Sequence, residues 1–207
     1  MLKIHIIGGP GSGKTTLGQE IAARFNIPHY DLDQLGWKNG MDHAAYVKDA
    51  FAIAQQPGWV TENIGLIWVD PLLFAANYIV LLEVSWPVAA WRIVRRHIYK
   101  SLQGTNQYPG VKRLLLFLKD THDYYLNKCS ANTAKTIEQY LKEHEESIEP
   151  LDAIRLLARL EKYGLEIIFA PTEEFVCRYL EKYQPKVIRV RNNADRKRLL
   201  ELLTQCR

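Results

Sequence analysis

The stretch that decides the fold lies near the N-terminus and reads Gly8-Gly9-Pro10-Gly11-Ser12-Gly13-Lys14-Thr15. It matches the pattern GxxxxGK[ST] at every fixed position. Before it, residues 3–7 (KIHII) form a short apolar run of the kind found in buried strands. After it, Leu17, Ile21 and Ala22 recur at helical spacing. The sequence therefore predicts a strand, a glycine-rich turn and a helix in direct succession.

This loop has the composition of a phosphate-binding site. Glycines allow the backbone to turn so that successive N–H groups converge, and the N-terminus of the next helix adds partial positive charge. The Lys14 side chain is long enough to reach β- and γ-phosphates, and the Thr15 hydroxyl is a suitable ligand for Mg²⁺. We expect a nucleoside triphosphate at nine residues: Gly8, Gly9, Pro10, Gly11, Ser12, Gly13, Lys14, Thr15 and Thr16.

The rest of the chain alternates between apolar runs and helical patterns. Further strands are predicted over 27–31, 59–61, 78–84, 165–170 and 186–190. The run over 78–84 (YIVLLEV) shows no polar alternation, which is typical of a strand covered on both faces. Most of these runs are separated by helical patterns. This order predicts an α/β fold with a doubly wound parallel sheet of about five strands. Ligands of such sheets bind beyond the carboxyl ends of the strands.

The segment 100–163 differs because its pattern is almost entirely helical. Apolar residues recur along it at threes and fours, and Pro150 indicates a break between two helices. We therefore expect a single domain, 1–207. Its core comprises residues 1–99 and 164–207, and a helical lid or insertion covers about 100–163.

Composition narrows the class of protein. Hydrophobic residues make up 47% of the 207 residues and charged residues 24%, which excludes disordered and collagen-like chains. The N-terminus lacks the apolar region of a signal peptide. Polar residues and prolines interrupt the most apolar stretch, 71–91, so no membrane span is indicated. The three cysteines are too few and scattered for a disulfide framework. We expect a soluble cytoplasmic protein without a membrane partner.

The net charge of +4 is unevenly distributed. Residues 178–207 contain nine Lys or Arg and three Asp or Glu, which gives this segment +6 and leaves −2 for the rest. Such a segment suits nucleic acid or another phosphorylated ligand. It suits equally well the solvated face of a helix, and both interpretations remain open.

The loop GGPGSGKTT (8–16) resembles the phosphate-binding loop of adenylate kinases and related small kinases. Residues 31–37 (DLDQLGW) and 59–63 (WVTEN) are similar to FlaR-like proteins, a branch related to adenylate kinase whose members are often labelled DNA topology modulation proteins. The resemblance covers about residues 3–96 and returns at 187–191 (VIRVR). It implies ATP as phosphoryl donor, Mg²⁺ as cofactor and a basic lid that closes over the γ-phosphate.

The same resemblance implies roles for four further residues. Glu62 stands where these kinases usually place an aspartate that holds the hydration shell of Mg²⁺, so Thr15 and Glu62 are the expected metal residues. Arg92 and Arg96 match the arginine pair at the base of the kinase lid, where one lies near the nucleotide and the other contacts the transferring phosphate. The alternative for this pair is a solvated basic helix face. Arg191 follows the last strand, where backbone groups of these proteins contact adenine.

Asp33 is the residue we expect to hold the acceptor. In sugar and shikimate kinases, which resemble this group, a carboxylate here orients the acceptor hydroxyl and takes its proton. Asp31 and Asp33 face opposite ways if the strand continues, so only one of them is expected in the site. The alternative role for Asp33 is to cap the next helix.

No arginine occurs between Phe25 and Trp91. Nucleoside monophosphate kinases use arginines from this region to bind the acceptor phosphate. We therefore expect a hydroxyl acceptor held by hydrogen bonds and by stacking on Trp37, Trp59 or Trp68, unless these tryptophans belong to the core. A phosphorylated acceptor remains open if lid residues reach it.

These features together predict an ATP-dependent phosphotransferase that acts on a small molecule. Its expected catalytic residues are Lys14, Asp33, Arg92 and Arg96. The alternative is a nucleotide-gated protein that binds nucleic acid through the basic C-terminal segment and transfers no phosphate. The sequence does not indicate an oligomeric state.

Overall fold

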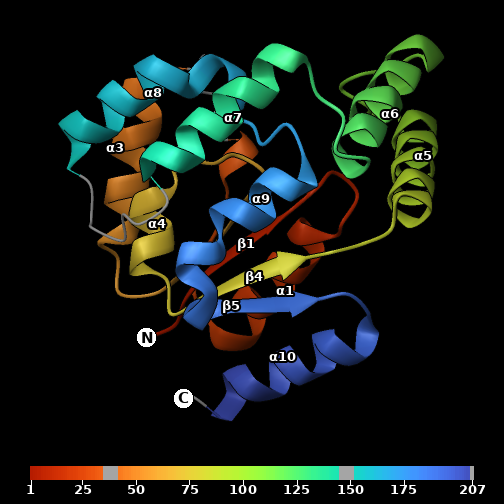
Figure 1. Cartoon of the computed structure of the whole chain (residues 1–207). Helices are drawn as coiled ribbons and strands as arrows, with labels where there is room; N and C mark the ends of the chain where they lie inside the picture. Colours follow the sequence, from red (N-terminus) through yellow and green to blue (C-terminus); the bar gives the residue numbers. More distant parts are fainter. Residues whose placement is uncertain (35–41, 145–151, 206–207) are drawn as a thin grey trace.

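Strand β1 (Lys3–Gly8) lies at the centre of a parallel sheet (Figure 1). The computed structural model describes residues 1–34, 42–144 and 152–205, and in them the sheet has five strands in the order β2-β3-β1-β4-β5. The other strands are β2 (His29–Asp31), β3 (Trp59–Asn63), β4 (Tyr78–Leu82) and β5 (Val187–Val190). All pairings between them are parallel. The predicted α/β class and doubly wound parallel sheet are therefore confirmed.

Helices cover both faces of the sheet, which is why its strands are continuous apolar runs. On one face, Ile4, Ile6 and Val80 pack with α1 (Lys14–Phe25) and α10 (Asn193–Gln205). On the other face, Ile7, Ile79 and Leu81 pack into a larger core. The elements of that core are α3 (His43–Ala54), α4 (Asp70–Ala75), α7 (Ala131–His144), α8 (Ala153–Ile167), α9 (Glu173–Tyr179) and the 3-10 helix η1 (Glu181–Lys186).

Two further helices extend beyond these layers, although Ala89 of the first and Tyr124 and Tyr125 of the second belong to the larger core. α5 (Trp86–Leu102) follows β4, and α6 (Val111–Tyr125) packs against it as a helical hairpin. Figure 1 shows that this hairpin projects beyond the carboxyl end of β4. Among the helices that the structure describes, none is both long enough and apolar enough to span a membrane.

The helical segment 100–163 is divided between two places. α6 lies beside the glycine loop, whereas α7 and α8 pack on the sheet through fully or nearly fully buried side chains such as Tyr140, Leu156 and Leu160. The helices α7 and α8 are therefore part of the core, and only the α5–α6 hairpin overhangs the end of the sheet. The predicted break at Pro150 lies outside the described residues.

The strand predicted over 165–170 is wrong. Helix α8 continues to Ile167, and beyond it Phe169 forms only an isolated antiparallel bridge with Gly65. A short apolar run cannot by itself distinguish a strand from the end of a buried helix. Here Leu156, Leu160 and Ile167 continue the helical spacing of α8, and all three are completely buried.

Truncation of α8 tests its place in the core. We expect Leu160→Ala to lower the free energy of unfolding by about 2–5 kcal/mol, because it leaves a cavity at a fully buried site. Ile154→Ala on the same helix is the matched control, since Ile154 is 80% exposed and little should change. Urea unfolding of both variants measures the difference. Equal effects would show that α8 does not pack as described.

Candidate active site

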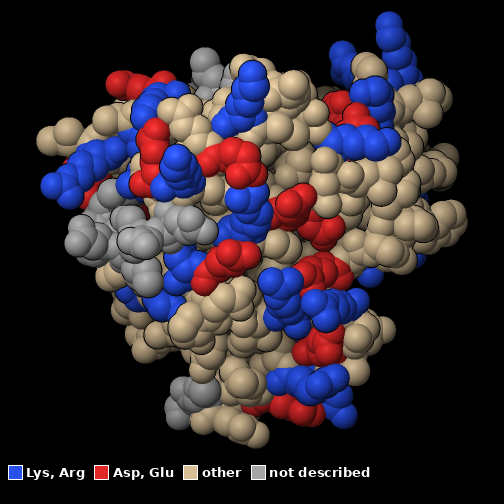
Figure 2. Space-filling model, in the orientation of Figure 1, with Lys and Arg blue, Asp and Glu red and all other residues tan. Residues whose placement is uncertain are grey.

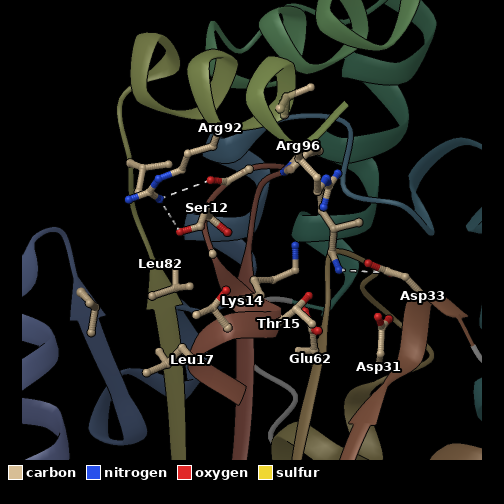
Figure 3. A pocket seen from close by; sticks show the side chains of 18 of the residues that line it. Ser12, Lys14, Thr15, Leu17, Asp31, Asp33, Glu62, Leu82, Arg92 and Arg96 are labelled. Atoms are coloured by element: carbon tan, nitrogen blue, oxygen red, sulfur yellow. Dashed lines mark hydrogen bonds between the residues drawn. The ribbon is translucent and has the colours of Figure 1, made fainter. Parts of the chain in front are cut away.

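A cavity of about 910 Å³ opens at the carboxyl ends of the central strands (Figure 3). Its wall includes residues 10–17 of the glycine loop and α1, the end of β2, Glu62 of β3, part of α5 and the loop after β5. This is where a doubly wound sheet places its ligands, and the volume suits a nucleotide with a small second molecule. The cavity is lined by ten of the predicted site side chains: Pro10, Ser12, Lys14, Thr15, Thr16, Asp33, Glu62, Arg92, Arg96 and Arg191.

The glycine loop requires glycine at particular positions. Gly11 and Gly13 have φ values of 79° and 101°, which side chains rarely adopt. A Cβ atom on Gly11 would also lie 2.7 Å from the carbonyl oxygen of Ala89 in α5. The loop therefore combines a left-handed backbone with close packing against the hairpin.

Lys14 is buried within this loop. Its Nζ donates hydrogen bonds to the carbonyl oxygens of Gly8, at 2.9 Å, and Gly9, at 3.4 Å. These bonds hold the ammonium beneath the loop, where Figure 3 shows it between Thr15 and the hairpin arginines. A cation fixed here attracts phosphate oxygens that enter the cavity.

Glu62 lies beside Thr15 at the end of β3 and is only 2% exposed. Burial raises the pKa of this carboxyl to about 7, although a hydrogen bond with the Thr15 hydroxyl and the charge of Lys14 oppose the shift. Its Oε1 atom has no hydrogen-bond donor among the described residues. The Nε2 atom of His29 lies 3.7 Å away, and burial lowers the pKa of that imidazole. A buried carboxylate oxygen without a donor fits a nearby cation.

These groups fit a magnesium ion that binds mainly through phosphates and water. Mg²⁺ commonly keeps several waters and takes only one or two protein ligands. Thr15 and Glu62 offer this number, and the described residues contain no group of three or more His, Cys, Asp or Glu side chains that could hold a metal by itself. Residues 35–41, 145–151 and 206–207 are outside this statement.

Asp31 and Asp33 have different partners. β2 ends at Asp31, whose carboxylate accepts hydrogen bonds from the backbone N–H and the side-chain amide of Gln34 at 3.1 and 2.8 Å. Asp31 therefore takes the capping role that was the alternative for Asp33. Among the residues that the structure describes, Asp33 accepts one long bond, from the Ile64 N–H at 3.5 Å. Burial raises its pKa, and Lys14 partly opposes this.

The expectation that only one of these aspartates enters the site is wrong. Strand alternation stops at Asp31 because residues 32–34 are helical, and both carboxylates line the cavity. Figure 3 shows the two side chains at neighbouring positions on the same wall. Both residues are half-buried, and within the described part of the chain Asp33 keeps more of its hydrogen-bonding capacity for a ligand than Asp31 does.

The two hairpin arginines also differ. The Nη1 of Arg92 donates to the carbonyl oxygens of Ser12, at 2.9 Å, and Gly11, at 3.3 Å, so its guanidinium supports the loop backbone. Arg96, one turn further along α5, lines the cavity and extends toward its interior in Figure 3. Arg92 thus holds the loop, and Arg96 is the arginine positioned to meet a ligand.

Arg191 is engaged on both sides. Its Nε donates to Glu83 at 2.6 Å, and its backbone N–H donates to Asp195 at 3.0 Å. The backbone donor expected to contact adenine is therefore already bonded in this structure.

Tyrosines of α6 form contacts with the loop that the sequence did not reveal. The Tyr125 hydroxyl donates to the carbonyl oxygen of Pro10 at 3.1 Å. A Cβ atom on Gly9 would lie 2.5 Å from the Tyr124 ring and 2.8 Å from the Tyr125 hydroxyl oxygen. Sequence spacing places both tyrosines on a buried helix face, but only the fold brings that face to the loop.

Apolar side chains in the wall of the cavity form a second group that the sequence did not reveal. Ile64, Phe117 and Phe169 line the cavity, and backbone pairing of Gly65 with Phe169 brings the last of these beside β3. The predicted stacking residues Trp59 and Trp68 are buried in the core, and Trp37 lies outside the described residues.

Acidic partners neutralise much of the basic C-terminal segment. Figure 2 shows Lys and Arg side chains alternating with Asp and Glu side chains over β5 and α10. The pairs are Arg178–Glu138, Arg189–Glu83, Arg191–Glu83, Arg196–Glu20, Lys197–Glu201 and Arg198–Asp195. This pairing favours the solvated helix face over a nucleic-acid interface.

Comparison with known proteins adds a local sequence likeness. No family model matches the chain. A curated shikimate kinase from Paracidovorax citrulli (strain AAC00-1) is 50% identical to it over 34 residues, which make up 16% of this chain and 19% of that protein. The match spans about a fifth of the length of that relative.

Three solved structures show distant likeness. A shikimate kinase from Bacteroides thetaiotaomicron is 14% identical, with 98% of each chain covered and a TM-score of 0.44. A shikimate kinase from Acinetobacter baumannii in complex with shikimate is 16% identical, with 80% of this chain and 94% of that chain covered and a TM-score of 0.40. A gluconokinase from Sinorhizobium meliloti 1021 is 18% identical, with coverages of 62% and 98% and a TM-score of 0.37. Likeness at this level carries no conclusion about activity.

The raised pKa of Glu62 predicts a pH-dependent stability. The folded state keeps this carboxyl protonated up to about pH 7, whereas the unfolded chain ionises it near 4.5. Its contribution to the free energy of unfolding is thus present below pH 4.5 and is lost as the pH rises through 7. We expect Glu62→Gln to be more stable than the wild type at alkaline pH, by on the order of 2 kcal/mol.

Urea unfolding across this pH range, without Mg²⁺, measures the effect. Glu161→Gln, at an exposed position of α8, is the control and should follow the wild-type profile. If the profiles of Glu62→Gln and the wild type run parallel throughout, Glu62 is not protonated in the folded state at neutral pH.

Proposed function

We propose that this protein is a small-molecule kinase that transfers the γ-phosphoryl group of ATP to an acceptor hydroxyl. One observation carries this proposal: the buried cation of the glycine loop, Lys14, and the half-buried Asp33 line the same cavity, where the charge of Lys14 opposes the rise in the pKa of the Asp33 carboxyl. A phosphate-binding group and a proton acceptor are thus positioned for the same reaction. The 34-residue likeness to a shikimate kinase supports this class of activity.

The donor half of the site would bind the triphosphate. Backbone N–H groups of the loop and the Lys14 ammonium attract the phosphate oxygens, while Arg92 keeps the loop in shape. Thr15 and Glu62 would hold Mg²⁺ and its water shell, and this ion supplies positive charge to the phosphates when bound. Arg96 would compensate charge on the transferring group.

The acceptor half would hold an alcohol. Asp33 accepts a hydrogen bond from its hydroxyl and takes the proton as the oxygen bonds to the γ-phosphorus, while the bond to the β–γ bridging oxygen breaks and ADP leaves. Ile64, Phe117 and Phe169 offer apolar contact beside it and exclude water, which would otherwise compete as acceptor. This arrangement favours an acceptor bound by hydrogen bonds and apolar contact.

The finer assignment to the FlaR-like branch rests on residues 31–37 and 59–63. Of these, residues 35–37 lie outside the described part of the chain. The alternative function, nucleic-acid binding through residues 178–207, loses support because most cations there are paired within the protein.

Substitution of the two central side chains tests the proposal. We expect Lys14→Ala to abolish acceptor-dependent release of ADP, and Asp33→Asn to lower kcat by about 10²–10⁴-fold with little change in ATP affinity. Asp152→Asn is the matched control, because Asp152 caps α8 outside the cavity wall and asparagine still caps a helix, so kcat should stay within about threefold. The assay is ADP release from Mg·ATP against a panel of nucleosides, nucleotides and hydroxylated metabolites. ATP binding without turnover on any panel member would contradict the kinase proposal.

Loss of the Tyr125 hydroxyl tests how α6 supports the loop. We expect Tyr125→Phe to weaken ATP binding by about 3–10-fold, because one hydrogen bond that orients Pro10 is lost. Tyr30→Phe is the control, since the Tyr30 hydroxyl bonds Gln56 away from the loop. Calorimetric titration with Mg·ATP compares the two. Equal ATP affinities would show that α6 does not position the loop.

A further inference from the structure

The free end of the α5–α6 hairpin carries an exposed apolar surface. We call residues 98–115 the hairpin tip. Its exposed large apolar side chains are Ile98, Tyr99, Leu102, Tyr108, Val111 and Leu115. Leu102 and Val111, on either side of the turn, are 82% and 69% exposed. Single exposed apolar residues are common, but a cluster of this kind marks a surface that binds something.

The hairpin is also strongly basic. Residues 86–125 contain seven Lys or Arg and two acidic residues, Asp120 and Asp123, which gives the hairpin a net charge of +5. Lys119 pairs with Asp123, but within the described residues no acidic side chain pairs with Lys100, Lys112 or Arg113 at the tip. Figure 2 shows Lys and Arg side chains, with Asp or Glu among them, over α6 beside an extended uncharged surface over α5. The basic C-terminal segment is neutralised internally, whereas the tip is not.

Positive charge and apolar surface occur together at the tip, and this combination indicates which kind of partner it binds. A second copy of the chain would bring two positive tips together, which costs free energy. A nucleic acid would attract the cations, but it offers stacking to aromatic rings and no comparable partner for Ile98, Leu102, Val111 and Leu115. A bilayer with anionic lipids satisfies both features, because apolar side chains enter the interface while Lys and Arg reach the headgroups.

The shape of the tip agrees with such a surface. Figure 1 shows the hairpin projecting from the body of the molecule, so its end can reach a flat surface without a matching groove. Tyr99 and Tyr108 have the amphipathic rings that favour the level of the headgroups. A docking surface of this kind lies within the interface and needs no helix that crosses the membrane.

In contrast to the expectation from the sequence that the protein has no membrane partner, we propose that the hairpin tip is a docking surface for a bilayer that contains anionic lipids. Docking would also place the active-site cavity at the membrane, because Gln107 and Tyr108 of the tip line the rim of that cavity. This inference does not depend on the kinase proposal, since binding to vesicles can be measured without ATP or an acceptor.

Vesicle sedimentation with the full-length chain tests the proposal. One set of vesicles contains phosphatidylcholine alone, and the other contains phosphatidylcholine mixed with phosphatidylserine. We expect binding to the anionic vesicles to be at least about tenfold stronger, and to weaken as the salt concentration rises. Equal or no binding to both kinds of vesicle would overturn the proposal.

Two tip variants and their matched controls test whether the tip is the part of the protein that binds the vesicles. Leu102→Glu removes apolar area and Lys100→Glu reverses a charge, and each should weaken binding to anionic vesicles by about tenfold or more. Ile154→Glu and Lys135→Glu make the same changes at exposed positions of α8 and α7 and should bind as the wild type does. Thermal unfolding of all four variants checks that they fold.

Other occupants would give distinct results. Self-association in sedimentation equilibrium that Leu102→Glu abolishes would identify a second copy as the partner and overturn the proposal. Binding of a single-stranded oligonucleotide that Lys100→Glu abolishes, with no preference for anionic vesicles, would identify a nucleic-acid surface instead. Tip variants that bind vesicles like the wild type would also overturn it.

Discussion

The Lys14 ammonium, buried in the turn that follows β1, is the interaction on which the site depends. Its bonds to the Gly8 and Gly9 carbonyls keep the loop closed around a positive charge. β1 is the central strand, so this charge lies at the middle of the carboxyl edge of the sheet. Ligand-binding groups from both sides of the sheet therefore gather around one cation.

The carboxylates opposite this cation form the second half of the same electrostatic arrangement. Burial raises the pKa of both Glu62 and Asp33, and the charge of Lys14 acts against the shift in each case. The site thus holds two carboxyl groups whose ionised forms are disfavoured until positive charge arrives. A magnesium ion would supply positive charge to Glu62, and the proton of an alcohol would pass to Asp33. The raised pKa values of the two carboxyl groups are thus connected with phosphoryl transfer.

The α5–α6 hairpin joins this centre to the surface of the molecule. Arg92 and Tyr125 hold the loop from one side, Arg96 and Phe117 face the cavity, and the tip beyond them is basic and apolar. One element therefore supports the phosphate-binding loop, completes the cavity and presents a separate surface outward. The helices α7 and α8 follow the hairpin in the sequence, but they pack into the core.

Local patterns in the sequence determined the loop, most of the strands and the α/β class, because glycine spacing and apolar periodicity depend only on nearby residues. The strand predicted over 165–170 was wrong, because a short apolar run is equally compatible with a strand and with the end of a buried helix. The different partners of Asp31 and Asp33, the engagement of Arg92 and Arg191, and the α6 tyrosines on the loop were decided by tertiary structure alone. Each depends on contacts between residues far apart in the chain or on where a strand ends, and no local pattern records those distances. The charge of segment 178–207 shows the same division. The sequence determines its number of basic residues, whereas only the folded chain brings Glu20, Glu83 and Glu138 close enough to pair with them.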